Sequence, residues 1–150
     1  MTPSADTAPR IAVFASFSGK GGVERMLLNL AEGFAGIGCH VDLLMIKSSS
    51  LHLETVPRGL NLIKLHANHT WSSLPELTGY LQRARPEALL AAKDRANQVA
   101  ILARRLSRTA TRLAVRMGTH VSTAIAGKGG VKKLLWYLPI RLLYRQADEI

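Results

Sequence analysis

The sequence has little cysteine, few aromatic residues and no long apolar run, and each shortage excludes a class of protein. A single cysteine, Cys39, cannot form an intramolecular disulfide, which fits a reducing cytoplasm. Aromatic residues make up 5% of the chain, too few for the base-stacking platforms of nucleic-acid-binding proteins. Charged residues interrupt every apolar stretch before the ~20 residues that a membrane-spanning helix needs. We therefore expect a cytoplasmic protein that binds no nucleic acid.

The rest of the composition is typical of a single globular domain. The 150 residues are 47% hydrophobic and 20% charged, which is enough apolar material for one core. Residues 1–9 are polar, contain proline and lack the apolar segment of a signal peptide, so we expect them to be disordered.

The formal charge of +10 is concentrated in the second half of the chain. Residues 81–150 contain fourteen Lys/Arg and four Asp/Glu, whereas residues 1–80 are neutral overall. A basic half indicates either a polyanionic partner, such as an anionic membrane surface, or a solvated face without a partner. Charge alone favours the solvated face.

The stretch SGKGGVERM at 18–26 follows an apolar run and raises the question of a phosphate-binding loop. Its first six letters resemble the start of the deviant P-loop of many ATPases. A P-loop continues with a lysine for the β- and γ-phosphates and a hydroxyl for magnesium, but Glu24, Arg25 and Met26 stand here instead. An ATPase is therefore the weaker hypothesis.

Two glycines at the end of a strand predict a different kind of site. Gly21 and Gly22 have no Cβ, so a ligand can approach the backbone closely, and the helix that follows directs free N–H groups to the same place. The combination suits a phosphate or an oxygen-rich sugar.

Apolar segments with strand character alternate with segments of helical periodicity. This alternation predicts an α/β fold, a Rossmann-like and mostly parallel sheet flanked by helices. Strands are expected at 10–17, 40–46, 60–65, 87–92 and 111–117, and helices at 23–36, 73–85, 97–107 and 131–145, with Asn97 as the cap of the third helix and Leu106 on its inner face.

The order of these elements, with GGVER at the first turn and Gly38-Cys39-His40-Val41 before the second strand, resembles family-four glycosyltransferases of the GT-B fold. The segments Lys93–Asn97 and Leu143–Ile150 are similar to later parts of the same domain. The resemblance implies that residues 1–150 are the acceptor-side, N-terminal domain. It also implies a second domain, absent from this chain, that holds most of the donor.

The resemblance further implies sugar transfer with retention of anomeric configuration, from a nucleotide sugar to a saccharide or lipid-linked acceptor. It implies no cofactor and no essential metal, and a role in cell-envelope polysaccharide synthesis. The protein would then be cytoplasmic, with peripheral contact to the inner face of the membrane as a further expectation. Without its donor domain the fragment is expected to be inactive.

Candidate site residues follow from the expected carboxyl ends of the strands, where doubly wound sheets bind ligands. For Glu24 and Arg25, a favourable helix dipole or a plain surface charge explains the residue as well as a ligand does. For Lys93 and Asp94 the alternative is a solvated loop. The predicted substrate-binding residues are Gly21, Gly22, Glu24, Arg25, Lys93 and Asp94, and the predicted catalytic residues are Arg116 and His120, which resemble the family's reacting region after the fifth strand.

Two rival functions remain beside the glycosyltransferase. One is a P-loop-like ATPase, which lacks its magnesium hydroxyl here. The other is a basic module that binds membrane or nucleic acid, which would not need the glycine turn.

Overall fold

The computed structural model describes residues 8–16, 22–46, 59–117, 144–145 and 147–148. Five parallel strands form one sheet in the order β3-β2-β1-β4-β5. The strands are β1 (Arg10–Ser16), β2 (His40–Ile46), β3 (Leu60–Lys64), β4 (Ala88–Ala92) and β5 (Arg112–Arg116). The expected α/β, Rossmann-like sheet is confirmed, and all of its described strand pairs are parallel.

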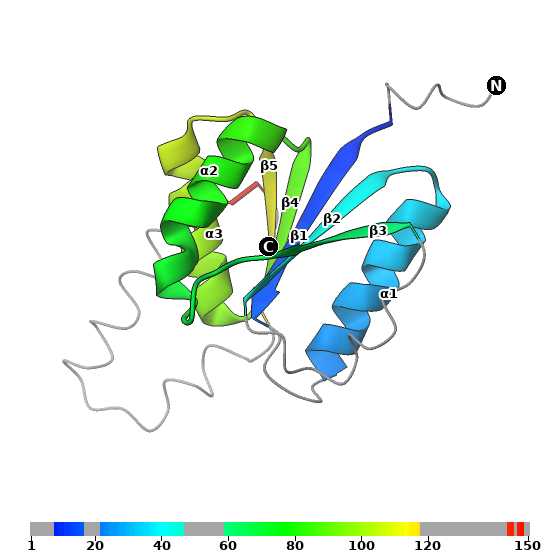
Figure 1. The fold of residues 1–150 in the computed structure, drawn as a ribbon, viewed down its shortest axis with the longest axis horizontal. Helices are drawn as coiled ribbons and strands as arrows, with labels where there is room; N and C mark the ends of the chain where they lie inside the picture. Colours follow the sequence, from blue (N-terminus) through cyan, green and yellow to red (C-terminus); the bar gives the residue numbers. More distant parts are fainter. Residues whose placement is uncertain (1–7, 17–21, 47–58, 118–143, 146, 149–150) are drawn as a thin grey trace.

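Helices cover both faces of the sheet. In Figure 1, α1 (Gly22–Gly36) lies on one face, and α2 (Leu74–Ala84) and α3 (Asp94–Ser107) lie side by side on the other. A short 3-10 helix, η2 (Trp71–Ser73), precedes α2. Because successive side chains of a strand point to opposite faces, Val13 and Ala15 pack under α1, whereas Ala12 and Phe14 pack under α2 and α3.

The bounds of the first elements agree with the local sequence signals. The β2 strand spans His40–Ile46 as predicted, and α1 ends at Gly36. Gly38 follows with φ +92°, a left-handed conformation that glycine adopts without the steric cost of a Cβ.

The start of the third helix was predicted wrongly. The α3 helix begins at Asp94, not at Asn97, and its N-cap residue is Lys93. The backbone N–H of Asn97 donates to the Lys93 carbonyl at 2.9 Å, so Asn97 already lies inside the helix. Leu106 was expected on the inner face but is 56% exposed. The face of α3 that covers the sheet is formed largely by alanine, valine and isoleucine side chains, and Leu106 lies outside it.

Several sequence predictions fall on residues outside the described ranges. Residues 1–7 of the segment expected to be disordered, Gly21, His120 and almost all of the last predicted helix belong to these. Pro9, at the start of the described part, accepts a hydrogen bond from the His40 N–H at 2.9 Å.

Candidate functional site

The candidate site lies where the strand order reverses. The β1 strand is central, and its neighbours β2 and β4 are reached by crossovers on opposite faces of the sheet. The carboxyl ends of β1 and β4 therefore lie next to each other, between the first turns of α1 and α3, and this place is called the crevice below, after the position of the ligand crevice in doubly wound sheets. Doubly wound sheets bind ligands at this switch point.

Lys93 joins the two sides of the crevice. Its ammonium donates a hydrogen bond of 2.6 Å to the carbonyl of Ser16, the last residue of β1. It also forms an ion pair of 2.9 Å with a carboxylate oxygen of Glu24, in the first turn of α1. The Glu24 side chain is 1% exposed and the Lys93 side chain 33% exposed. The pair, called the floor of the site below, thus lies between the two strand ends, with the lysine as its more exposed member.

The backbone of Lys93 is held in an unusual conformation. Its φ of 77° and ψ of 138° lie in a region that only glycine populates readily. The two hydrogen bonds of the ammonium fix the side chain on β1 and α1, which compensates for the backbone cost. Strained residues of this kind concentrate at binding and catalytic sites.

Gly22 lies beside this floor, as the first residue of α1. Its φ is outside the left-handed range, and a Cβ built on it would meet no atom within 4 Å. Neither backbone conformation nor packing in the described structure therefore demands glycine at this position. The open space above the backbone is available to a ligand.

The other predicted residues are placed less closely together. Asp94 begins α3 and is half-buried, and Arg25 is exposed on α1. Arg116 ends β5, opposite Ala92 of β4, with an exposed side chain. The structure thus joins Glu24 and Lys93 directly and places Arg116 two strands away from β1, at the same edge.

Asn97 belongs to this edge and was not recognised from the sequence as part of it. Its side-chain nitrogen donates to the Arg116 carbonyl at 3.0 Å and to the Tyr144 hydroxyl at 3.2 Å. Burial, together with the nearby charge of Asp94, raises the pKa of Tyr144 against the opposing effect of the Asn97 hydrogen bond. The sequence signal was a polar residue between Ala96 and Val99 on the buried face of a helix.

A second buried polar cluster lies nearer the amino ends of the strands, and its role is structural. Asp42 on β2 accepts hydrogen bonds from Tyr80 at 2.6 Å, Asn61 at 2.8 Å and Arg10 at 3.0 Å. Burial alone would raise the pKa of Asp42, but the three hydrogen bonds and the Arg10 charge hold it below its usual value. Burial and the Asp42 carboxylate raise the pKa of Tyr80 far above its ordinary range.

Within the described ranges, no group of three or more His, Cys, Asp or Glu side chains is arranged to hold a metal ion. His66 is paired with Glu76 at 3.3 Å on the surface. No described helix has the length and apolar character needed to span a bilayer.

Comparisons with known proteins agree with the parallel α/β fold described above. A family model described as "Glycosyl transferase 4-like domain" matches residues 21–150. Among solved structures, the apo form of the lipopolysaccharide outer core galactosyltransferase WaaB is similar, with 15% sequence identity and a TM-score of 0.55. The similarity covers 71% of this chain and 32% of that one, so the chain spans about a third of its neighbour's length. No curated protein matches.

Proposed function

The chain belongs to the glycosyl transferase 4-like family, and we propose that it forms the acceptor-side domain of an enzyme that transfers a sugar from a nucleotide-sugar donor. The observation that carries this proposal is the Lys93 ammonium in the crevice between β1 and β4, tied to the end of one strand and to the first turn of one helix. A site at the switch point of a parallel sheet fits a ligand shared with a second domain.

Lys93 is proposed as the charged contact for the substrate. An ammonium has three donors, and two of them are engaged by Ser16 and Glu24 in the described structure. The third donor, on a side chain that is one-third exposed, is available to a donor phosphate or an acidic group of the acceptor. Such a charge-assisted hydrogen bond is stronger than a neutral one.

Glu24 is proposed to position Lys93. Its carboxylate is almost fully buried and bonded to the lysine, so it sets the direction of the ammonium. Gly22 is proposed to let the substrate approach the backbone, where the N-terminus of α1 presents N–H groups and a positive dipole end to negative charge.

The finer features of the reaction follow from the family resemblance and belong to the proposal. They are transfer with retention, no essential metal, and a saccharide or lipid-linked acceptor of the cell envelope. The structural neighbour is by its title a lipopolysaccharide galactosyltransferase, in keeping with such an acceptor. Because an acceptor of that kind is membrane-bound, we place the enzyme in the cytoplasm at the inner membrane face.

The proposal is tested by comparing Lys93→Ala with a matched lysine variant within the full-length protein. Removing a charged hydrogen-bond donor from bound substrate should lower kcat/KM for sugar transfer by about tenfold to a hundredfold. Release of the nucleotide product from a panel of nucleotide sugars is the measurement. Lys64→Ala, at the exposed end of β3, is the control and should retain activity. An unchanged kcat/KM in Lys93→Ala would refute the proposed site.

A further inference from the structure

A hollow of about 860 Å³ lies at the amino edge of the sheet, on the opposite side from the crevice. The first residues of β1, β4 and β5 and the last residues of α2 and α3 form its wall. Its volume is in the range of small-molecule sites. Three arginines line it, Arg85, Arg108 and Arg112, together with a single acid, Glu87.

These three arginines come from three different parts of the fold. Arg85 follows α2, Arg108 follows α3 and Arg112 begins β5. In the part of the chain that the structure describes, no ion pair or side-chain hydrogen bond engages their guanidinium groups. All three arginines are exposed, and a bound anion would offset the repulsion between their like charges.

Stabilisation of the helix ends accounts for only part of this arrangement. A cation near a helix C-terminus is favourable, and Arg85 and Arg108 occupy such positions. Both, however, have left-handed backbones, with φ of 42° and 54°, where glycine is the favoured residue. Arg112 begins a strand and does not end a helix, yet its side chain lines the same hollow.

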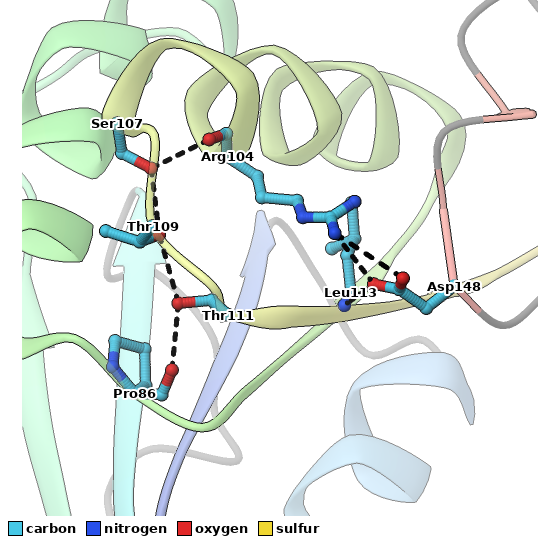
Figure 2. Close-up of polar contacts among 7 residues, drawn as sticks. All are labelled: Pro86, Arg104, Ser107, Thr109, Thr111, Leu113 and Asp148. Carbon is cyan, nitrogen blue, oxygen red and sulfur yellow. Dashed lines mark hydrogen bonds and ion pairs between the residues drawn. The ribbon is translucent and has the colours of Figure 1, made fainter.

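Three hydroxyl groups, those of Ser107, Thr109 and Thr111, belong to residues that line the hollow, and Figure 2 shows the contacts that join them. Ser107 donates to the Arg104 carbonyl and Thr111 to the Pro86 carbonyl, both at 2.8 Å. Thr109 lies 3.0 Å from the Ser107 oxygen and 3.1 Å from the Thr111 oxygen, with one proton for the two contacts. Every hydroxyl proton is thus used internally, so recognition of an anion falls to the arginines.

We propose that this hollow binds a phosphate-bearing anion, at a site separate from the crevice where sugar transfer is proposed. Guanidinium groups match the geometry of phosphate oxygens and bind them through paired hydrogen bonds. A neighbouring hollow of about 480 Å³ shares Arg108 and adds Arg105, together with Arg104, whose charge is paired with Asp148 at 3.2 Å. The phosphate group belongs either to a soluble ligand or to a lipid headgroup.

The experiment uses the 150-residue protein with two probes at physiological ionic strength. Inorganic pyrophosphate is titrated by calorimetry, and vesicles of phosphatidylcholine with or without phosphatidylglycerol are tested by co-sedimentation. The variant is the triple change Arg85→Gln, Arg108→Gln and Arg112→Gln, with Arg83→Gln in α2 as the control. If the triple variant unfolds, the single change Arg112→Gln replaces it, because Arg112 begins β5 and lies at no helix end.

We expect pyrophosphate affinity to fall at least about tenfold in the triple variant and to stay within about twofold in the control. Binding to phosphatidylglycerol vesicles that the same variant removes would also support the proposal, with a lipid as the source of the phosphate. No binding of either probe, or binding that the triple variant leaves unchanged, would overturn it. Loss of pyrophosphate binding in Lys93→Ala but not in the triple variant would place the anion in the crevice and overturn it as well.

Discussion

At the scale of single residues, Lys93 combines a costly backbone with a side chain that the structure holds at two points. Its conformation lies in the region that suits glycine, while its ammonium reaches Ser16 and Glu24. We therefore expect Lys93 to contribute through its side chain and not through its backbone. Substitutions can separate the free-energy cost of the backbone conformation from the contribution of the ammonium.

The backbone cost of Lys93 is measured by comparing Lys93→Gly with Lys93→Ala. Both changes remove the ammonium from Glu24, but only glycine relaxes the backbone at φ 77°. We expect Lys93→Gly to be more stable than Lys93→Ala by about 1 kcal/mol, since strain relief exceeds the entropic cost of glycine in the unfolded chain. Urea unfolding of the two variants checks this. Equal stability, or a more stable alanine variant, would contradict the assigned conformation.

Gly22 permits a similar separation between folding and function. A side chain at this position meets open space in the described structure, so Gly22→Val should change the unfolding free energy by no more than about 1 kcal/mol. If substrate occupies that space, sugar transfer by the full-length enzyme should be lost. Melting temperature and turnover measured on the same preparation separate the two effects.

The control for Gly22→Val is Gly33→Val, at an exposed site in the last turn of the same helix. A Cβ there also meets no neighbouring atom, but Gly33 is far from the first turn of α1. Gly33→Val should therefore retain turnover. A stable Gly22→Val enzyme with normal turnover would show that the glycine turn does not contact substrate.

At the scale of elements, Asp42 links three strands and a helix on one face of the sheet. It lies on β2, and its partners Arg10, Asn61 and Tyr80 come from β1, β3 and α2. A buried carboxylate that accepts three hydrogen bonds is stabilising only while it is ionised. The link should therefore weaken in acid.

The pH dependence of this link follows from the lowered pKa of Asp42. Its contribution to stability is fully present above its unfolded pKa of about 4 and is lost as the pH falls through the folded pKa. Asp42→Asn should cost about 2 kcal/mol near neutral pH, and the difference from wild type should shrink below about pH 4. Urea unfolding over a pH series is the measurement. The exposed Glu32→Gln is the control and should differ little from wild type throughout.

At the scale of the whole molecule, the two edges of the sheet carry different charged groups. The carboxyl edge holds the Lys93–Glu24 ion pair, and the amino edge holds a hollow lined by three arginines that form no ion pair with the described residues. The edge at which parallel α/β sheets bind substrate is the carboxyl edge. The arginine-lined hollow is therefore a second place where this domain meets negative charge.

The isolated domain should not behave as an ATPase. The first turns of α1 carry Arg25 and Met26 where a P-loop has its lysine and magnesium-binding hydroxyl, and the preceding Glu24 is already engaged by Lys93. We expect the 150-residue protein to hydrolyse no ATP and to bind nucleotide sugars weakly, because the chain spans only about a third of the length of the galactosyltransferase that it resembles in fold. Calorimetry with magnesium-ATP and a panel of nucleotide sugars tests this. Tight, magnesium-dependent ATP binding would contradict it.

The sequence by itself determined the strands and the first two helices, because these depend on local patterns. Continuous apolar runs predicted β1 and β2 to within a residue, and Gly36 and Gly38 predicted the end of α1. The parallel arrangement followed from the alternation of strands with helices. Lys93 and Glu24 were both expected near the site, since each follows a strand end.

Only the tertiary structure decided which of these side chains meet. Glu24 and Lys93 are 69 residues apart, and their ion pair depends on β1 and β4 being neighbours in the sheet. The start of α3 at Asp94 also differs from the local signal of Asn97, which lies three residues later. The arginines of the amino edge likewise come from separate elements, and the sequence showed only their excess. Local patterns specify elements, whereas pairing between distant charges depends on strand order, which no local pattern encodes.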